Sequence, residues 1–320
     1  MANTNIADGK MIYHADRVYH NQAPITADIF LTNFCNNKCP YCTYRRWEFD
    51  TGARYLGYDD FVKYATRMIE LGVRGFILTG GGEPTLSPDF DKITGWLQEN
   101  NLHYGINTNF NKIKYIKPDY LKVSLDGWDE KSYSKSRGVE KYEVVRYNIR
   151  KYLEWKSENS PKTAVGIQMV AENIDDVLQF YEANKDLDVT YMSIRPMEST
   201  NGSYYKSPDH SDYLKIYEFI KRLQEIDSRV VPNFKWTMVA EQEETCIANW
   251  SQIAINEIGE VLYCCHKPYQ IVGHIMDEDI LEKKKQASTD MSMCDIPCRL
   301  TAPNKEVATM LSSKKDVYFI

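Results

Sequence analysis

Short apolar runs alternate with longer amphipathic stretches along residues 26–200. The short runs have the length of buried strands, and the expected strands are Ala27–Leu31, Gly75–Leu78, His103–Asn107, Tyr120–Ser124, Thr163–Met169 and Thr190–Ile194. The longer stretches have helical spacing, and the expected helices are Asp59–Leu71, Asp89–Asn100, Tyr142–Trp155 and Asp175–Asn184. This alternation predicts an α/β fold with a parallel sheet, either an open doubly wound sheet or an incomplete barrel.

The pattern changes after residue 200. Residues 201–235 begin with a polar, loop-like stretch and contain one expected helix, Asp212–Ile226. From Trp236 onward, short strands and turns replace the regular alternation. The expected segments are an N-terminal extension at 1–25, a core at 26–200, a bridging segment at 201–235 and a small α+β domain at 236–320.

Polar residues recur where the expected strands end. They are Cys35, Gly80–Glu83, Thr108, Asn109, Ser124, Asp126, Gln168 and Arg195. Because the active sites of parallel α/β architectures lie at the carboxyl ends of the strands, we expect one site to span this edge. Asp126 fits this set least well, since an aspartate before a glycine at a strand end is typical of a turn.

Composition and charge narrow the function classes. A hydrophobic content of 43% and a charged content of 26% are ordinary for a globular protein. The net charge of −6 argues against a nucleic-acid-binding surface, because neutralising a phosphate backbone needs a basic face, so nucleic acid is not an expected partner. Lys283, Lys284 and Lys285 form the only dense basic run of the sequence, and we expect it to be a solvated helix face.

The chain is expected to work in the cytoplasm, without a membrane partner. Its apolar runs are shorter than the ~18 residues that span a bilayer, and its polar N-terminus lacks the apolar middle of a secretory signal. Thiols stay reduced in the cytoplasm, so the 8 cysteines indicate metal binding or catalysis before disulfides. None lies between Cys42 and Cys246, which predicts two separate sites.

Cys35, Cys39 and Cys42 form a CxxxCxxC run with Tyr41 before its last cysteine. Three clustered thiols leave one coordination position open, as catalytic metal centres do. This run and the segment TGGGEPTL at Thr79–Leu86 resemble the two signature motifs of the radical S-adenosylmethionine (SAM) superfamily, in the same order. The resemblance implies a partial (β/α)6 TIM-like barrel over about residues 26–200.

The resemblance also implies cofactors and chemistry. Each of the three cysteines would bind one iron of a [4Fe–4S] cluster, and the methionine amino and carboxylate groups of SAM would occupy the remaining iron. An electron from the cluster would cleave SAM to methionine and a 5′-deoxyadenosyl radical, which abstracts a hydrogen atom from the substrate. A partner such as flavodoxin or ferredoxin would supply the electron.

The glycine-rich segment matches the family's GGE motif. Gly81 and Gly82 would let the backbone approach SAM closely, which a Cβ would obstruct. Glu83 would accept a charge-assisted hydrogen bond from the methionine ammonium. These three residues are therefore expected to bind SAM.

Other SAM-binding residues are spread over the core. Ser124 matches a serine that family members use toward the polar end of SAM, and Arg137 would face its carboxylate. Tyr41 and the strand around Val165–Gln168 match segments that contact adenine, with Gln168 late in that strand.

The late cysteines form a second pattern. Cys246 precedes Gly259, and Cys264 follows that glycine by five residues. This order resembles the twitch or SPASM extensions of radical SAM enzymes, and it implies one auxiliary [4Fe–4S] cluster rather than the two of a full SPASM extension. Its expected ligands are Cys246, Cys264, Cys294 and Cys298. A closed four-cysteine zinc site is the alternative.

Cys265 is the one late cysteine that is not an expected ligand of the auxiliary cluster. If Cys264 lies on an extended segment, the side chain of Cys265 points to the opposite face and would face the substrate. A thiol there would return a hydrogen atom to a carbon radical from the face opposite the abstraction, which inverts a stereocentre. The alternative is that Cys265 is a small buried hydrophobic residue.

The resemblance to radical SAM enzymes implies an enzyme of oxidoreductase or epimerase type. Its favoured substrate is a peptide or a small polar natural product, which would be oxidised, cross-linked or epimerised. A dehydrogenase or epimerase of a sugar or aminocyclitol is the alternative within the family. A non-catalytic zinc-binding α/β protein is the alternative of another class, and iron and sulfide content separates it from the enzyme.

Overall fold

The structure is a computed structural model that describes Arg17, residues 24–42, Tyr44, and residues 52–196, 210–233, 246–265 and 267–290. Its centre is a 10-stranded sheet in the order β10-β9-β8-β1-β2-β3-β4-β5-β6-β7. The strands are β1 (Thr26–Phe30), β2 (Gly75–Thr79), β3 (His103–Thr108), β4 (Tyr120–Ser124), β5 (Ala164–Ala171), β6 (Tyr191–Pro196), β7 (Val230–Pro232), β8 (Gln252–Ile255), β9 (Glu260–Cys264) and β10 (Lys267–His274). Strands β8 and β1 to β7 pair in parallel, whereas β9 pairs antiparallel with β8 and β10.

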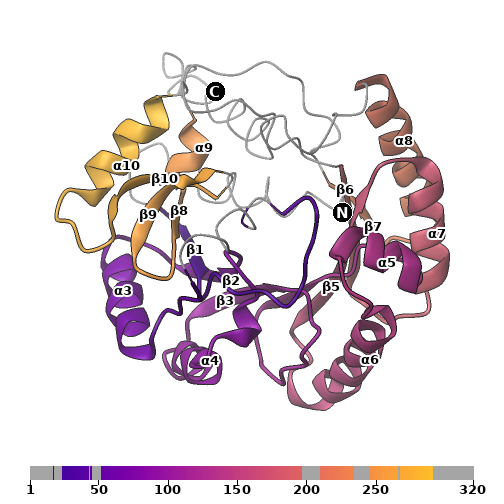
Figure 1. Cartoon of the computed structure of the whole chain (residues 1–320), viewed down its shortest axis with the longest axis horizontal. Helices are drawn as coiled ribbons and strands as arrows, with labels where there is room; N and C mark the ends of the chain where they lie inside the picture. Colours follow the sequence, from indigo (N-terminus) through magenta and orange to yellow (C-terminus); the bar gives the residue numbers. More distant parts are fainter. Residues whose placement is uncertain are drawn as a thin grey trace, which may run out of the picture.

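Helices surround the outside of this curved sheet (Figure 1). They are α3 (Tyr58–Glu70), α4 (Phe90–Glu99), α5 (Glu130–Arg137), α6 (Tyr142–Asn159), α7 (Ile174–Asn184), α8 (His210–Ile226), α9 (Ile247–Trp250) and α10 (Ile280–Thr289), with a 3-10 turn η2 (Pro84–Leu86) after β2. Most of them connect one parallel strand to the next, as in a TIM barrel. The predicted α/β fold with a partial barrel is confirmed.

The six strands and five helices expected from the sequence are present, with ends that shift by a few residues. Helix α5 was not expected, because its sequence EKSYSKSR has almost no apolar residues to set a helical period. A capping box begins it instead: Ser132 N donates to the Asp129 carboxylate at 2.6 Å, and Asp129 N donates to Ser132 Oγ at 3.0 Å.

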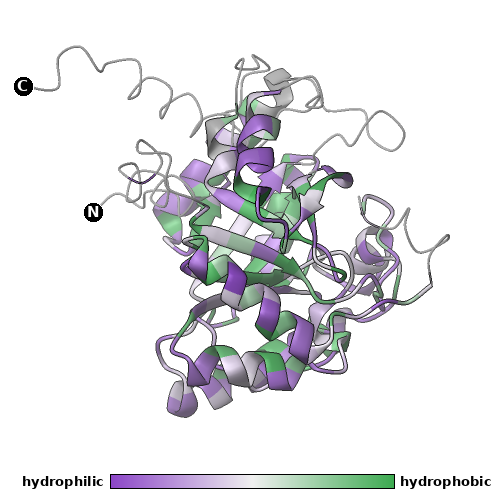
Figure 2. Cartoon of the chain, turned by 90° about the vertical axis from the view of Figure 1, so that its left-hand side faces the viewer, coloured by the Kyte–Doolittle hydropathy of each residue, from purple (hydrophilic) through white to green (hydrophobic). Residues whose placement is uncertain are grey.

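The main core lies between the sheet and the outer helices. In β1, Ala27 and Ile29 are fully buried on that side, together with Phe61 of α3 and Phe90 of α4. Asp28 lies between these two strand residues and therefore faces the inside of the barrel, because strand side chains alternate. Figure 2 shows the same division, with hydrophobic residues on the strands and polar residues along the outer sides of the helices.

The C-terminal strands continue the barrel sheet. β8 pairs in parallel with β1, so that Thr26 lies opposite Gln252. β9 and β10 then extend the same edge as an antiparallel ribbon, against which α10 packs. The segment that carries Cys264 and Cys265 is thereby attached to the strand that precedes Cys35.

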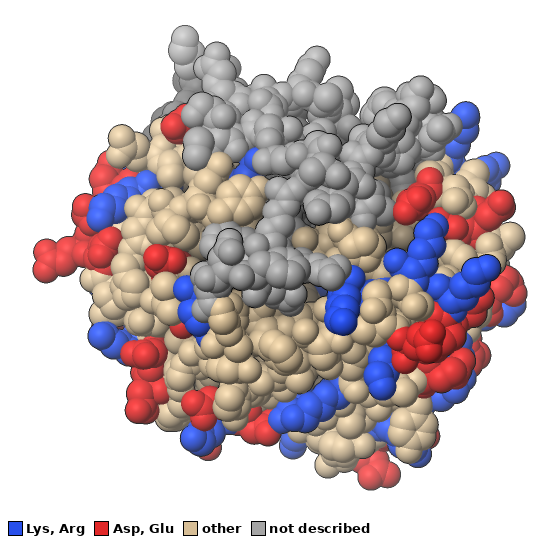
Figure 3. All heavy atoms as spheres, viewed as in Figure 1, with Lys and Arg blue, Asp and Glu red and all other residues tan. Residues whose placement is uncertain are grey.

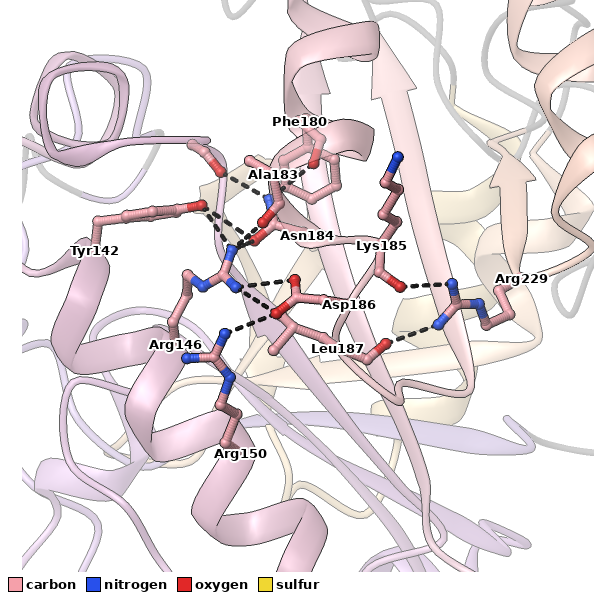
Figure 4. A network of polar contacts seen from close by, with 11 residues as sticks. Tyr142, Arg146, Arg150, Phe180, Ala183, Asn184, Lys185, Asp186, Leu187 and Arg229 are labelled. Carbon is pink, nitrogen blue, oxygen red and sulfur yellow. Dashed lines mark hydrogen bonds and ion pairs between the residues drawn. The ribbon is translucent and has the colours of Figure 1, made fainter.

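A polar network joins α6, the end of α7 and the start of β7 (Figure 4). Arg146 donates to both carboxylate oxygens of Asp186 at 2.9 Å, and Arg150 binds the same carboxylate at 2.7 Å. Arg229 donates to the backbone carbonyl of Leu187 at 2.7 Å. This network links the three elements to one another. None of its residues lines the cavity at the carboxyl ends of the strands.

The surface carries charges of both signs. Figure 3 shows basic and acidic side chains intermixed on the face seen there. Within the described ranges, no helix is long and apolar enough to cross a membrane.

Candidate active site

The carboxyl ends of the barrel strands surround a cavity of about 370 Å³. Strands β1 to β6 each contribute a side chain to it: Asp28, Thr79, Asn107, Lys122, Gln168 and Arg195. Cys35, Cys39 and Cys42 line the same cavity, as do the turn Gly80–Glu83 and the late cysteine Cys265. Residues far apart in the sequence thus meet around one space.

Hydrogen-bond donors point at two of the three cysteine sulfurs. Asn37 N lies 3.4 Å from Cys35 Sγ, and Asn109 Nδ2 lies 3.8 Å from the same atom. Arg137 Nη1 lies 3.5 Å from Cys39 Sγ. Burial raises the pKa of the Cys35 thiol to about 12, which disfavours the free thiolate. The N–H groups aimed at Cys35 and Cys39 act in the opposite direction, because they favour negative charge on these sulfurs.

Gly81 and Gly82 lie where the glycine-rich turn packs against residues 32–42. This segment carries Cys35, Cys39 and Cys42 and is called the cysteine loop. Gly82 N donates to Thr32 O at 2.7 Å, and Glu83 N donates to Phe34 O at 2.8 Å. A Cβ on Gly82 would lie 1.9 Å from Phe34 O, and Gly81 has a φ of +36°. The two glycines are thus required by the close approach of the chain itself, while both also line the cavity.

Glu83 is a buried carboxylate that joins two strand ends. Its Oε1 accepts hydrogen bonds from Thr85 N at 3.2 Å, Thr85 Oγ1 at 2.7 Å and Thr108 Oγ1 at 2.5 Å. Its Oε2 accepts one from Asn109 N at 2.7 Å. Burial raises the pKa of the Glu83 carboxyl, and these hydrogen bonds oppose that shift. The carboxylate is held rigidly at the edge of the cavity.

Asp126 is the centre of a buried polar group beside the cysteine loop. Its Oδ2 accepts from Tyr41 Oη at 3.0 Å and forms an ion pair with Arg137, while Oδ1 accepts from Val170 N at 2.6 Å. Asp126 has a φ of +43°, a left-handed conformation that aspartate tolerates better than most residues. Its links to Tyr41, 85 residues away in the sequence, and to Arg137 at the end of α5 were not expected.

Ser124 and Gln168 lie side by side on β4 and β5 and both line the cavity. Asp28 and Lys122, which were not expected at the site, lie in the middle of strands β1 and β4. A signal for both was available, since a charged residue at the centre of a short apolar strand indicates a polar barrel interior. Tyr44 was missed too, and its Oη donates to Cys265 O at 2.6 Å.

A profile described as the Radical SAM superfamily matches residues 29–183, which contain the three early cysteines and the glycine-rich turn. Residues 29–183 are a radical SAM domain. The domain lies inside the core of residues 26–200 that the sequence predicted.

Curated relatives of this radical SAM domain are named probable GTP 3′,8-cyclase. The relative from Saccharolobus islandicus is 25% identical over 206 residues, which cover 61% of this chain and 64% of the relative. The relative from Methanococcus maripaludis is 30% identical over 132 residues, which cover 39% of this chain and 44% of the relative. The chain thus spans less than two thirds of the length of these relatives.

Two solved structures share the fold. Streptococcus suis SuiB bound to precursor peptide SuiA is 17% identical with a TM-score of 0.66, and the match covers 89% of this chain and 70% of SuiB. Native anSMEcpe with bound AdoMet and Cp18Cys peptide is 14% identical with a TM-score of 0.62, and the match covers 91% of this chain and 100% of anSMEcpe. These matches support the partial barrel.

A radical SAM domain implies SAM and one [4Fe–4S] cluster as cofactors, and the residues present fit both. The sulfurs of Cys35, Cys39 and Cys42 share one cavity, and N–H groups are aimed at the sulfurs of Cys35 and Cys39. Of the side chains expected to bind SAM, Glu83, Ser124, Arg137 and Gln168 line the same space, whereas Tyr41 does not. Within the described residues, no group of three or more His, Cys, Asp or Glu is arranged to hold a single metal ion.

The late cysteines are described only in part. Cys246 and Cys264 lie on segments that meet at α10, whereas Cys294 and Cys298 lie outside the described residues. The auxiliary ligand set expected from the sequence therefore stays a prediction. Cys265 is partly buried and packs near Phe30, and it also lines the cavity.

The expectation that the run Lys283–Lys285 is a solvated helix face is wrong for its middle residue. Lys283 is partly exposed and pairs with Asp277 at 3.0 Å and Asp279 at 2.9 Å. Lys284 is fully buried, because successive residues of α10 point in different directions and this one points at the sheet. Burial lowers the pKa of the Lys284 ammonium to about 8.

Glu83→Ala should keep the iron content and weaken SAM binding roughly tenfold or more, because a hydrogen bond to a charged group contributes about 1.5–3 kcal/mol. The measurement is SAM binding by equilibrium dialysis on the reconstituted protein, with an iron assay beside it. Thr108→Val is the control, since it removes one donor to Glu83 and keeps the carboxylate. Unchanged SAM affinity in Glu83→Ala would remove this residue from the SAM site.

Proposed function

We propose that the chain is a radical SAM enzyme that abstracts a hydrogen atom from a peptide or a natural product. One observation carries the proposal: the three early cysteines, the Gly80–Glu83 turn and Cys265 line a single cavity of about 370 Å³. The bound cofactors would supply the electron and the carbon radical that remove hydrogen from the substrate. The chain supplies the cluster ligands, the SAM contacts and the substrate surface.

SAM would be held mainly by residues that line the cavity. Glu83 would accept from the methionine ammonium, and Ser124 and Arg137 would bind the polar end. Arg137 is also paired with Asp126, so its guanidinium is held in a fixed orientation. Tyr41, whose hydroxyl donates to the same Asp126, and Gln168 would contact the adenine. Gly81 and Gly82 line the same cavity and would contact SAM through their backbone.

The substrate surface is polar and charged. Asp28, Lys122 and Arg195 line the cavity from β1, β4 and β6. They suit a substrate with hydrogen-bonding or ionised groups, such as a peptide, better than a hydrocarbon. The choice of a peptide over a sugar or aminocyclitol rests on fold similarity to SuiB, whose solved structure holds its precursor peptide.

A second candidate is cyclisation of a nucleotide. The curated relatives are named probable GTP 3′,8-cyclase. Lys122 and Arg195 line the cavity in addition to Arg137, and these two cations would suit phosphate groups. The matched region covers only 64% of the first relative. Cyclisation of GTP, the activity in the name of that relative, is therefore an alternative for this chain and not the favoured function.

The C-terminal region would hold an auxiliary [4Fe–4S] cluster on Cys246, Cys264, Cys294 and Cys298. The described part supports this, because Cys246 N donates to Ser288 O of α10 at 2.8 Å and the Cys264 segment packs on the same helix. An electron donor such as flavodoxin or ferredoxin would serve both clusters. The expected cytoplasmic location rests on thiol chemistry and stays a prediction.

Cys265 would determine the outcome of the reaction. After hydrogen abstraction from one face of the substrate carbon, the Cys265 S–H would give a hydrogen atom to the opposite face. The C–H bond forms as the S–H bond breaks, the stereocentre is inverted, and a thiyl radical remains on Cys265. One electron from the external donor and one proton from solvent then restore the thiol. Tyr44 would hold the Cys265 backbone at the cavity through its 2.6 Å hydrogen bond.

The substrate class can be tested by incubating the anaerobically reconstituted enzyme with SAM and dithionite. Peptides encoded beside the gene, amino sugars and GTP are the candidates to compare. We expect 5′-deoxyadenosine formation to rise with a peptide. A rise with GTP alone would replace the proposal by the cyclase alternative.

Cys265→Ala should stop inversion while 5′-deoxyadenosine still forms, since the cofactor-binding residues are untouched. In deuterated water, the wild-type product should carry one deuterium at the inverted carbon, because a thiol exchanges with solvent. Mass spectrometry and chiral analysis of the hydrolysed product measure both. Cys42→Ala is the matched control, which should lose 5′-deoxyadenosine as well. A two-electron mass loss without deuterium would show that Cys265 only packs.

A further inference from the structure

Lys284 of α10 is a fully buried cation in the C-terminal region. Its Nζ donates to Asn249 Oδ1 of α9 at 2.9 Å and to Leu262 O of β9 at 3.5 Å. It also donates to Tyr263 O, which accepts from Asn249 Nδ2 at 2.9 Å as well. The ammonium therefore joins α9, β9 and α10 at one point.

The groups to which this ammonium donates hydrogen bonds are neutral. In the part of the chain that the structure describes, no carboxylate lies within ion-pair distance of Lys284 Nζ, and its hydrogen-bond acceptors are two backbone carbonyls and one amide. Burying a charge away from water is costly unless an opposite charge balances it. Lysine is almost never fully buried without such a partner. The site therefore calls for a negative charge close by.

Both described auxiliary cysteines adjoin the residues that Lys284 contacts. Tyr263 directly precedes Cys264. Asn249 N donates to Cys246 O at 3.0 Å, and Cys246 N donates to Ser288 O, one helical turn after Lys284. The ammonium thus lies between the two segments that carry these cysteines.

We propose that the Lys284 ammonium is the counter-charge of an anionic iron–sulfur centre bound by Cys246 and Cys264. This inference rests on the auxiliary cluster of the proposed function. A [4Fe–4S] cluster with four thiolates carries net negative charge, and charge near the cluster is one of the factors that set its reduction potential. A fixed positive charge favours the reduced form, which is the more negative one. Lys284 thereby retains the cluster and raises its reduction potential.

The first test compares uncharged variants of the full chain after anaerobic reconstitution. Lys284→Met removes the charge and the donors, whereas Lys284→Gln removes the charge and keeps a donor. Lys283→Met is the matched control from the same lysine run. The readouts are the midpoint potential of each cluster, from EPR-monitored redox titration, and the iron lost to a chelator.

Both Lys284 variants should lower the potential of the auxiliary cluster and weaken its retention about 10- to 100-fold, the usual effect of altering a group that supports metal ligands. The cluster on Cys35, Cys39 and Cys42 should keep its potential in every variant, and Lys283→Met should match wild type. Wild-type behaviour of Lys284→Gln would overturn the proposal, because hydrogen bonding would then explain the role of Lys284.

The second test asks whether the effect of Lys284 on stability changes sign. Lys284→Met should lower the thermal unfolding midpoint of the loaded enzyme. In a Cys246→Ala/Cys264→Ala background the same change should raise the midpoint, because the buried charge there has no counter-charge. This comparison remains informative even if Lys284→Met alone does not fold. Destabilisation in both backgrounds would overturn the proposal.

The auxiliary cluster and the role of Lys284 as its counter-charge can be tested separately. If the wild-type chain holds a single cluster, or holds zinc at Cys246 and Cys264, the auxiliary cluster of the proposed function is wrong. If it holds two clusters and Lys284 affects neither potential nor retention, the auxiliary cluster stands and the counter-charge proposal is wrong.

Discussion

Replacing Cys35, Cys39 and Cys42 together with alanine should remove about half of the reconstituted iron and abolish 5′-deoxyadenosine formation. Each cysteine would bind one iron, so without them the SAM-binding cluster has no attachment. The second cluster, at the late cysteines, should remain and account for the iron that is left. Iron and sulfide assays, the brown absorbance band and chromatography of the SAM products measure these quantities.

Cys265→Ala is the control for this triple variant, because it changes a cysteine of the same cavity that is not an expected ligand. It should keep both the iron and 5′-deoxyadenosine formation. SAM cleavage that persists in the triple variant would contradict the assignment of the three cysteines. Zinc in place of iron in protein purified without air would favour the non-catalytic zinc-binding alternative.

Gly82→Ala should reduce SAM cleavage by roughly 100-fold or more, since a displacement of catalytic parts by about 1 Å costs that much. The new Cβ would lie 1.9 Å from Phe34 O, so the cysteine loop must move away from the glycine-rich turn. That movement breaks the hydrogen bonds from Gly82 N and Glu83 N, at 2.7 and 2.8 Å. Overpacking of this kind also lowers the free energy of unfolding by about 1–3 kcal/mol.

Gly80→Ala is the control for this prediction. A Cβ at Gly80 would have the Tyr44 ring as its nearest neighbour, at an ordinary contact distance of 3.5 Å. Its iron content, thermal midpoint and SAM cleavage should stay close to wild type. Equal behaviour of the two alanine variants would show that the turn and the cysteine loop do not pack as described.

Local patterns determined most of the fold. Strand and helix periods are set by which side of each element is buried, so β1 to β6 and helices α3, α4, α6, α7 and α8 could be predicted from sequence. Helix α5 escaped because its capping box, not an apolar stripe, begins it. The early cysteines and the glycine–glutamate turn were visible because their spacing is short and their chemistry is specific.

What only the tertiary structure decided is which distant groups meet. Asp126 was expected to be a turn residue and has a φ of +43°, yet it also binds Tyr41 and Arg137, which reach it from other segments. Cys265 lies more than 200 residues from Cys42 in the sequence, and the pairing of β8 with β1 helps to bring the two to one cavity. Contacts of this kind depend on strand order, which a single sequence does not display.

The run Lys283–Lys285 shows most clearly what the sequence determines and what the packing determines. The sequence determined that Lys283, Lys284 and Lys285 lie together on a polar helix, and by composition the three are equivalent. The packing of α10 against β9 decided that Lys284 alone of the three is fully buried, next to the segments of Cys246 and Cys264. Each step along a helix turns the side chain by about 100°, so a burial that differs between neighbours is set by what packs against the helix.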